Sequence, residues 1–310
     1  MIRLPVLLLL VSVAVFTLMK LSPVDPVDAY LGPAIAHAGP EQKARIAAAW
    51  GLDRPAPEQF LRWAGHVLRG DLGHSTAYDA PVADVLRDRI GASLALTGLA
   101  WLLSGALGFA LGAVAAGCGG WVDRGVRVYC YILASAPTFW LAMLMLALFS
   151  VTLGWAPICC AGPIGMPPDQ VGWADRLRHL TLPLAALTLF GVAQIALHTR
   201  ARMVEVLQSD FVLFARAQGA TRRQIVLRHG LRNAAIPALT VMLASVGEIF
   251  GGSILAEQVF AWPGLGRATV EAGLKGDVPL LLAIALLTTL VVALGNMAAG
   301  RLHPVLNPRL

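Results

Sequence analysis

The sequence predicts an all-α integral membrane protein with about six transmembrane helices. Hydrophobic residues (Ala, Val, Ile, Leu, Met, Phe, Trp, Tyr and Cys) make up 57% of the 310 residues, and charged residues make up only 14%. A soluble domain carries about 25% charged residues, so a water-soluble globule is excluded. The mean hydropathy of +0.69 indicates that much of the apolar surface faces lipid.

Long apolar stretches recur along the chain. A helix that crosses the roughly 30 Å hydrocarbon core needs about 20 mostly apolar residues. The stretches that satisfy this requirement are residues 4–21, 91–116, 126–153, 180–198, 234–255 and 280–299. The second and third are long enough to tilt or to project beyond the bilayer.

The first apolar stretch has two interpretations. Arg3 precedes it, and Ala36-His37-Ala38 resembles a signal-peptide cleavage site. That tripeptide lies well past the apolar stretch, which is itself longer than a typical signal core. We therefore expect a retained transmembrane helix over residues 1–21.

Basic residues in the short connections predict the orientation. They fall on one side of a six-span topology, and an excess of Lys and Arg marks the cytoplasmic side. They are Arg3, Arg124, Arg127, Arg200, Arg202, Arg216, Arg222, Arg223, Arg228, Arg232, Arg301 and Arg309. Both termini are expected in the cytoplasm, with residues 304–310 as a cytoplasmic tail and residues 22–90 outside.

Residues 22–90 are expected to form a small helical periplasmic segment. Residues 41–50 and 58–68 each place apolar side chains at helical spacing, and Gly51, Pro55, Pro57 and Gly70 interrupt the pattern. Two interpretations remain open: the helices dock something outside the membrane, or they lie in the membrane interface without a partner. Residues 91–303 then form a five-helix core.

Enzymatic motifs are absent from the sequence. It contains no G-x-x-x-x-G-K-[ST] phosphate loop, no H-E-x-x-H, no G-x-S-x-G and no clustered carboxylate pair. We expect no catalytic residue, no nucleotide site and no cofactor bound by this chain. The net charge of +6 is explained by the basic connections, since no nucleic-acid motif accompanies it.

The cysteine and histidine residues do not predict a metal site. Cysteines 118, 130, 159 and 160 are too few and too scattered for a disulfide framework. Adjacent Cys159 and Cys160 are expected to be two small apolar residues, with a soft-metal site as the alternative. The histidines at expected cytoplasmic helix ends are interpreted as surface residues; they are His198, His229 and His303.

The connection over residues 200–237 is amphipathic and basic. Apolar residues recur at helical spacing up to Ala215, Gly219 interrupts them, and they resume at Ile225. Such a helix, turn and helix either inserts an apolar ridge into a partner's groove or lies on anionic lipid with its arginines at the headgroups.

Glu248 lies near the middle of the fifth apolar stretch, where a carboxylate is costly and marks a functional hypothesis. It contacts a cationic or chelated metal substrate, or it is a structural glutamate at a helix seam where Gly247 and Gly251 permit close packing. Beyond this stretch, Phe260 and Trp262 precede a Pro-Gly turn. These residues form a re-entrant lid or an interfacial aromatic anchor.

Motifs along nearly the whole chain resemble one transporter family. They are Asp25-Pro26, Gly51-Leu52-Asp53-Arg54-Pro55, Gly70-Asp71-Leu72-Gly73, Pro137-Thr138-Phe139-Trp140-Leu141, Ala215-Arg216-Ala217-Gln218-Gly219-Ala220, Arg228-His229, Leu231-Arg232-Asn233-Ala234, Ile236-Pro237 and Phe260-Ala261-Trp262-Pro263-Gly264-Leu265-Gly266-Arg267. They are similar to the B-type permease subunit of the dipeptide, oligopeptide and nickel family of ABC importers.

The resemblance implies a permease subunit of the bacterial inner (plasma) membrane, with no catalysis of its own. Its implied partners are a second permease subunit, favouring a heterodimer, and two cytoplasmic ATPases that use ATP and Mg. A periplasmic substrate-binding protein delivers the cargo, and lipid surrounds the helices.

The resemblance also implies roles for particular residues. The ATPase-coupling helix is implied at Ala215, Arg216, Gly219, Ala220, Arg222 and Arg223. The translocation path is implied at Glu248, Gly251 and Gly252. A periplasmic loop near its mouth is implied at Phe260, Trp262, Pro263, Gly264 and Gly266.

Two positions depart from the family pattern: Leu213 stands where many ABC importers have glutamate, and Gln218 where peptide-type members have lysine. Residues 247–252 look slightly closer to nickel-type than to dipeptide-type permeases. Nickel, a metal chelate such as an opine-type metallophore, and di- or oligopeptides all stay open as cargo.

The competing function is an ion-coupled carrier or channel without an ATPase, which predicts several intramembrane ionisable groups and inverted repeats. Away from the ends of the expected spans, Glu248 is essentially the one such group, and no repeat is evident; a scaffold without transport is a weaker alternative.

Overall fold

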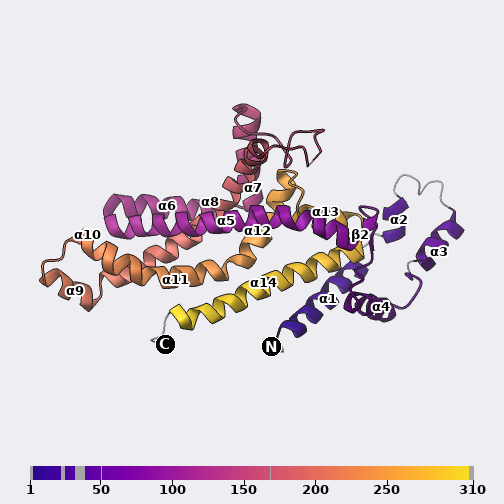
Figure 1. The fold of residues 1–310 in the computed structure, drawn as a ribbon, viewed down its shortest axis with the longest axis horizontal. Helices are drawn as coiled ribbons and strands as arrows, with labels where there is room; N and C mark the ends of the chain where they lie inside the picture. The colour runs from indigo at the N-terminus through magenta and orange to yellow at the C-terminus, as the bar shows by residue number, and fades with distance from the viewer. Residues whose placement is uncertain (1–2, 22–24, 32–38, 50, 168, 307–310) are drawn as a thin grey trace. The chain divides into compact units, whose positions relative to one another are not determined.

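The computed structural model describes residues 3–21, 25–31, 39–49, 51–167 and 169–306, and these are almost entirely helical (Figure 1). The chain divides into two compact units, residues 1–93 with 263–293 and residues 94–262 with 294–310. The long helices α5 (Val82–Cys118) and α14 (Val278–Leu306) each contribute to both units. The sequence assigns residues 263–293 to the five-helix core, whereas in the structure they group with residues 1–93.

The first unit begins with four helices: α1 (Arg3–Leu21), α2 (Pro26–Leu31), α3 (Pro40–Ala49) and α4 (Ala56–Leu68). α3 and α4 confirm the two helices expected within residues 22–90. Phe16 of α1 meets Phe60 of α4 edge to face, with ring centroids 5.3 Å apart. This aromatic contact fixes α4 against the apolar N-terminal helix.

A short hairpin and the C-terminal helices complete this unit. Strands β1 (His74–Ser75) and β2 (Ala80–Pro81) pair antiparallel, with Ser75 opposite Ala80. Their neighbours are the start of α5, helix α13 (Leu265–Leu274) and the start of α14. Buried apolar side chains from these elements form one cluster: Val82, Val85, Leu86, Leu265, Ala268, Ala272, Leu280, Ala283 and Ile284.

The second unit is built around α8 (Trp173–Leu207), which packs against α6 (Gly120–Ser135), α7 (Thr138–Met145), α11 (Leu231–Ala244) and α12 (Val246–Val259). Two glycines of α5 allow close approach to α8. A Cβ atom at Gly112 would lie 2.4 Å from the carbonyl oxygen of Ala196, and one at Gly108 would lie 2.8 Å from Cβ of Ile195. Small residues at such crossings are typical of membrane helix bundles.

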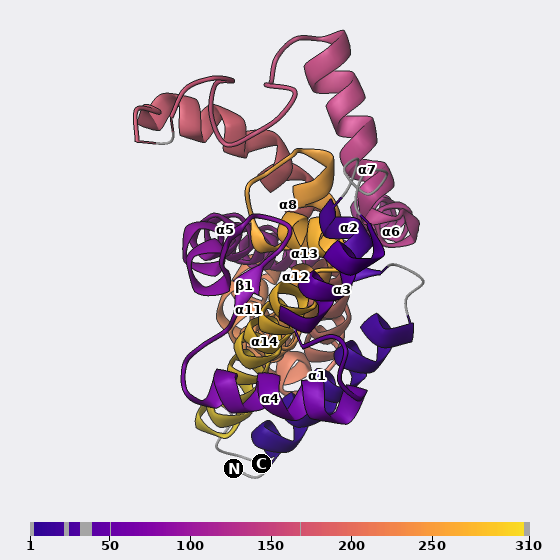
Figure 2. The same cartoon turned by 90° about the vertical axis from the view of Figure 1, so that its right-hand side faces the viewer.

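Two of the six expected spans are not single helices. Over residues 126–153, α6 gives way to α7 and the π-helical segment η2 (Leu146–Thr152) with a bend of 102°, and Figures 1 and 2 both show α7 turning away from α6. Ala136 is extended because Pro137 follows it. Over residues 234–255, α11 ends at Ser245 and α12 then begins.

Three described helices are long and apolar enough to cross a membrane: α5, α8 and residues 278–298 of α14. The bent pair of α6 with α7 and η2 adds a fourth candidate, and Leu4–Leu18 forms a shorter apolar helix. The protein is therefore an all-α membrane protein, and among the described residues two of the six expected spans are broken rather than single helices. The suggested cleavage tripeptide at residues 36–38 lies outside the described residues.

Candidate functional site

The connection between α8 and α11 contains helix α9 (Asp210–Ala217), a turn, helix α10 (Arg222–Ile225) and the π-helical segment η3 (Val226–Gly230). α9 ends at Ala217, and Gly219, two residues later, has a φ of +88°, the left-handed conformation. The amide of Gly219 donates to the carbonyl of Arg216 at 2.9 Å, and that of Ala220 donates to Ala215 at 3.0 Å. These two bonds are a Schellman motif, which requires a residue free to adopt positive φ.

A capping box starts the second helix immediately after this turn. The amide of Thr221 donates to Oε1 of Gln224 at 2.9 Å, and the amide of Gln224 donates to Oγ1 of Thr221 at 3.4 Å. The turn is therefore fixed on both sides by local hydrogen bonds. This confirms the helix, turn and helix that the spacing predicts, with Gly219 at the turn.

α9 buries one side chain and exposes an apolar ridge. Val212 is completely buried, whereas Leu213 and Phe214 are 54% and 66% exposed. Adjacent exposed apolar side chains of this size are typical of a surface that contacts a partner or a membrane. The exposed ridge of α9 is therefore apolar at both Leu213 and Phe214.

The arginines of the connection do not share one role. Nη2 of Arg222 donates to the carbonyl oxygen of Cys118 at 3.0 Å, so this side chain joins the connection to the end of α5. Arg223 and Arg216 are exposed. A cavity of about 710 Å³ lies beneath the connection, lined by Ala116, Val204, Leu207, Gln208, Leu213, Arg216, Ala220, Arg222 and Ile225. The hydrogen bond of Arg222 lies within the chain, but Arg222 is exposed, as Arg216 and Arg223 are.

A buried ion pair holds α6 to α8 near the same connection. Oδ1 and Oδ2 of Asp123 each accept a hydrogen bond of 2.7 Å from Arg200, through Nε and Nη2. Nε of Arg127 lies 3.3 Å from Asp123, close enough for charge attraction but without a hydrogen bond. Asp123 is only 8% exposed. The sequence suggested only a topological role for these arginines, because Asp123 and Arg200 lie far apart along the chain.

The expected path residues lie on α12. Glu248 is within this helix, but its side chain is outside the part that the structure describes. A Cβ atom at Gly252 would lie 3.5 Å from Cε1 of Phe190, so this glycine packs closely against α8. At Gly251 a Cβ atom would meet no described atom within 4 Å. Among the described residues, open space therefore lies beside Gly251.

Sequence reasoning missed a second acid on α12. Glu257 is fully buried, and its carbonyl accepts the amide of Trp262 at 2.8 Å. It lies just past the apolar window that ended at residue 255, so a search of that window alone could not find it. The sequence did not indicate this buried carboxylate.

The residues after α12 are buried rather than exposed to lipid. Phe260 is 2% exposed and packs with Ala142, Met145, Leu182 and Ala186. Trp262 is 6% exposed. An interfacial anchor would present these rings to the bilayer, so their burial disfavours that interpretation. Pro263, Gly264 and Gly266 lead into α13, with Gly264 preceding its first residue.

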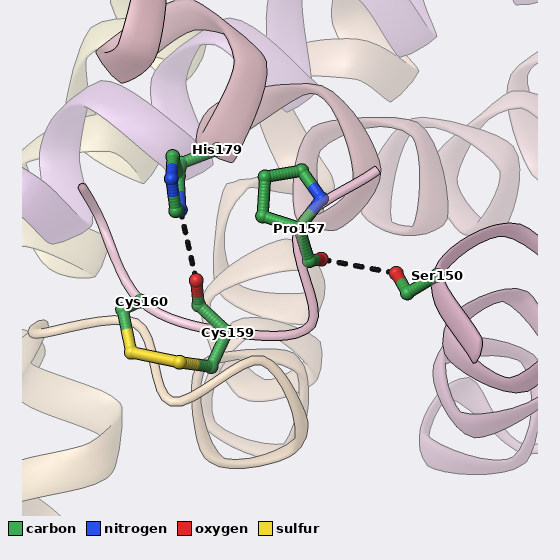
Figure 3. Close-up of a disulfide and its surroundings, with 5 residues drawn as sticks. All are labelled: Ser150, Pro157, Cys159, Cys160 and His179. Carbon is green, nitrogen blue, oxygen red and sulfur yellow. Dashed lines mark hydrogen bonds between the residues drawn. A yellow bond between two sulfur atoms is a disulfide. The ribbon is translucent and has the colours of Figure 1, made fainter. Parts of the chain in front are cut away.

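Cys159 and Cys160 form a disulfide between adjacent residues (Figure 3). This corrects the expectation of two independent small apolar side chains. The other two cysteines are free thiols, Cys118 at the surface and Cys130 buried. Among the described residues no group of three or more His, Cys, Asp or Glu side chains is arranged to hold a metal ion.

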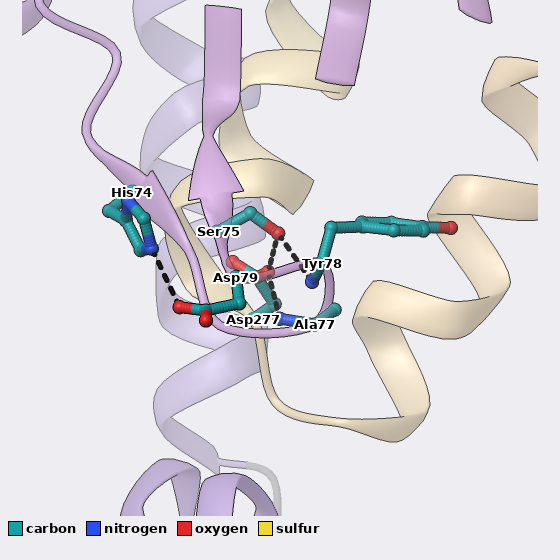
Figure 4. A network of polar contacts seen from close by, with 6 residues as sticks. All are labelled: His74, Ser75, Ala77, Tyr78, Asp79 and Asp277. Carbon is teal, nitrogen blue, oxygen red and sulfur yellow. Dashed lines mark hydrogen bonds and ion pairs between the residues drawn. The ribbon is translucent and has the colours of Figure 1, made fainter. Parts of the chain in front are cut away.

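Asp277 ties the hairpin of the first unit to the start of α14 (Figure 4). Its Oδ2 accepts hydrogen bonds from Oγ of Ser75 at 2.6 Å and from the amide of Ala77 at 2.9 Å. Its Oδ1 accepts the amide of Leu280 at 3.1 Å, which caps α14. Both Asp277 and Ser75 are fully buried, so this carboxylate fixes three backbone or side-chain groups at once.

Tyr78 extends this network from the hairpin to α13. Its hydroxyl donates to Oε2 of Glu271, whose other oxygen accepts Nε of Arg267 at 2.8 Å. Burial, followed by the hydrogen bond to Glu271, raises the pKa of Tyr78 to about 12. Although burial acts in the opposite direction, the Tyr78 hydroxyl and Arg267 hold the pKa of Glu271 below its usual value. Near neutral pH, Tyr78 is therefore the donor and Glu271 the charged acceptor.

Replacing Asp277 with alanine should detach the hairpin. The substitution removes three hydrogen-bond acceptor contacts and leaves the buried Ser75 hydroxyl without an acceptor for its proton, although it still accepts the Tyr78 amide at 3.3 Å, so stability should fall by about 2–3 kcal/mol. Limited proteolysis should then cleave residues 70–81 faster than in the unaltered protein. The matched control is Lys275→Ala, because exposed Lys275 makes a single bond to Ala77. Equal cleavage of the two variants would contradict the assigned role of Asp277.

The chain is similar to known transport proteins in both sequence and fold. Residues 108–310 match the family model described as "Binding-protein-dependent transport system inner membrane component". A putative peptide permease protein of Brucella suis is 34% identical, and the match covers 98% of this chain and 95% of that protein. The oligopeptide transport system permease protein AppB of Bacillus subtilis is 30% identical with the same coverage.

Further relatives point the same way. The di/tripeptide transport system permease protein DppB of Pseudomonas aeruginosa is 34% identical, covering 97% of this chain and 94% of that protein. The inward-facing MetNI methionine ABC transporter matches in structure with a TM-score of 0.59 and 19% identity, over 72% of this chain and 96% of the other. At that identity the match shows the fold alone. The slight preference for nickel-type permeases that residues 247–252 indicate finds no support in these relatives.

Proposed function

Because the chain belongs to the family of binding-protein-dependent inner-membrane transport components, we propose that it forms the translocation path for di- or oligopeptides in an ATP-driven importer. The cargo is proposed from the peptide permeases to which it is similar over nearly its whole length. It is a transport subunit, and we propose that it binds no nucleotide, metal or cofactor itself. ATP and Mg are used by partner ATPases.

The observation that supports coupling to an ATPase is the ridge of α9. Leu213 and Phe214 are exposed on a short helix whose end is fixed by the Gly219 turn. Ala215 and Ala220 flank this turn with small side chains, which allow close approach of a partner backbone. We propose that one cytoplasmic ATPase receives this ridge in a groove, with Arg216 and Arg223 at its rim.

We propose the following assembly around the chain. Both termini and the α8–α11 connection face the cytoplasm, and a second, different permease subunit packs beside this one, with a second ATPase attached to it. A periplasmic binding protein delivers the peptide near residues 260–266, and the path runs along α12 past Gly251 and Gly252. Closure of the ATPases favours one arrangement of the helices over another because the ATPases bind the two arrangements with different affinity.

Uptake measurements distinguish this function from an ion-coupled carrier. Cells with and without the chain are given labelled dipeptide and labelled nickel, while ATP and the proton gradient are collapsed separately. We expect dipeptide uptake that requires the chain, is lost on ATP depletion and survives loss of the gradient. Dependence on the gradient alone would support the carrier, for which the buried acid Glu257 is suited. Chain-dependent uptake of nickel without dipeptide would overturn the proposed cargo.

A further inference from the structure

The disulfide lies in the connection between η2 and α8, residues 153–172. It joins neighbours in the sequence, so it closes a small ring that contains the peptide bond between them. Cys160 has a φ of +76°, a left-handed conformation that is uncommon for residues other than glycine.

Two hydrogen bonds attach this turn to other elements. The amide of Cys160 donates to the carbonyl oxygen of Phe260 at 2.8 Å. Nδ1 of His179 on α8 lies 2.8 Å from the carbonyl oxygen of Cys159 (Figure 3), and it must be the donor because a carbonyl only accepts. Nearby, Oγ of Ser150 in η2 donates to the carbonyl of Pro157 at 3.0 Å.

The hydrogen bond from Cys160 to Phe260 lies at the end of α12. Phe260 is the residue at which α12 ends, and its ring is buried among side chains of α7 and α8. The next residue, Ala261, also has a positive φ, of +47°. The disulfide turn therefore bonds to the backbone where α12, on which the proposed path lies, changes direction.

We propose that Cys159 and Cys160 form a thiol–disulfide exchange site whose reduction releases the end of α12 and slows transport. A dithiol is the chemical class of reductant. It supplies two electrons and two protons: the bond between the two cysteine sulfurs breaks, two thiols form, and the two sulfurs of the reductant join to each other. Without the ring, Cys160 relaxes from the left-handed conformation, and its hydrogen bond to Phe260 is lost.

Exposure and compartment both favour such a site. Cys159 and Cys160 are partly exposed, and strained or exposed disulfides are the labile ones. The inference rests on the proposed function for its location, since the proposed orientation places residues 153–172 on the periplasmic side. Disulfides persist in that compartment, whereas the cytosol keeps thiols reduced.

Thiol labelling of the purified transporter tests whether the bond exists. The protein is treated with N-ethylmaleimide before and after dithiothreitol and analysed by mass spectrometry. Before reduction we expect exposed Cys118 to be alkylated and the peptide with Cys159 and Cys160 to be unmodified. After reduction that peptide should gain two alkyl groups. Alkylation of this peptide without reductant would overturn the proposal.

Hydrogen exchange tests the contact with α12 without any assumption about cargo. Loss of one buried hydrogen bond predicts roughly tenfold faster exchange at the Cys160 amide after reduction. A Cys159→Ser and Cys160→Ser double variant should exchange at the faster rate with or without dithiothreitol, and the matched control Cys118→Ser should behave as the unaltered protein. Unchanged exchange on reduction would overturn the proposed release of α12.

Uptake then tests the effect on transport. Labelled dipeptide uptake by the unaltered protein and by Cys118→Ser should fall roughly two- to tenfold on reduction, and the double serine variant should not respond. Equal uptake before and after reduction would overturn the regulatory part. Absence of uptake even by the oxidised, unaltered protein would instead count against the proposed cargo. Thiol labelling and hydrogen exchange would still test whether Cys159 and Cys160 form a thiol–disulfide exchange site.

Discussion

Replacing Gly219 with valine should abolish association with the partner ATPase while leaving insertion of the chain into the membrane intact. A Cβ atom at this position would meet no described atom within 4 Å, so the cost is not a clash. It is the φ of +88°, which a β-branched residue adopts only at high energy. The valine variant should therefore open the Schellman turn and move the ridge of Leu213 and Phe214.

The size of the effect follows from the fit of the ridge to a partner. A loss of about 1.4 kcal/mol of binding free energy is a tenfold loss of affinity. The valine variant loses binding free energy in two ways, because the turn is strained and because the ridge is displaced. We expect at least about a tenfold loss of co-purified ATPase and a matching loss of ATP-dependent uptake. Membrane levels should be unchanged because the turn is exposed and contributes little burial.

Asparagine at the same position is the matched control. Asn adopts the left-handed conformation far more readily than valine, because its polar side chain can hydrogen-bond locally. Gly219→Asn should therefore keep most of the ATPase, although it adds a side chain of similar size. If the asparagine and valine variants lost the ATPase equally, bulk rather than backbone conformation would matter. If both retained it, the α8–α11 connection would not be the coupling element.

Local patterns were enough to predict this turn. Glycine between two helical apolar patterns is a signal read from a few neighbouring residues, and the Schellman bonds span only residues 215–220. The two helices of residues 22–90 were predicted for the same reason. The fold class also followed from hydropathy, because helices that face lipid must be rich in apolar residues.

Contacts between distant residues were not predictable from such patterns. Asp277 meets Ser75 and Ala77 across about 200 residues of chain, and Asp123 meets Arg200 across 77. Nothing in the sequence near either acid indicates its partner, so the sequence could assign the arginines only to topology. The hairpin at His74–Ser75 and Ala80–Pro81 is short and lacks an alternating apolar pattern, so it was also missed.

Hydropathy located apolar stretches but not their interruptions. Pro137 was visible in the sequence as a residue that disfavours helix before it, yet the continuous apolar character outweighed it. The break at Ser245 has no such marker in the sequence. In the structure the amide of Ser245 donates to the carbonyls of Val241 and Met242, as at an ordinary helix end. Glu257 was missed because the window stopped two residues before it.

Replacing Arg200 with alanine should destabilise the protein strongly. Asp123 is almost completely buried, and Arg200 supplies both of its hydrogen bonds. Removal of one partner of a buried pair leaves an uncompensated charge, which costs about 3–5 kcal/mol. Arg127 remains 3.3 Å away and Arg200 is 27% exposed, so the lower end, about 3 kcal/mol, is expected. This should lower the melting temperature of the purified protein by roughly 5 °C.

Two further variants separate the buried charge from general damage to α8. Arg202→Ala removes a residue of the same helix whose ion pair with Glu205 is exposed, and it should change stability by less than about 1 kcal/mol. The double variant Asp123→Ala with Arg200→Ala removes the stranded carboxylate as well as its partner. It should therefore recover a large part of the lost melting temperature, because an unpaired buried charge costs more than the absence of the whole pair. A double variant no more stable than Arg200→Ala would show that side-chain packing by Arg200, rather than neutralisation of Asp123, holds α6 against α8.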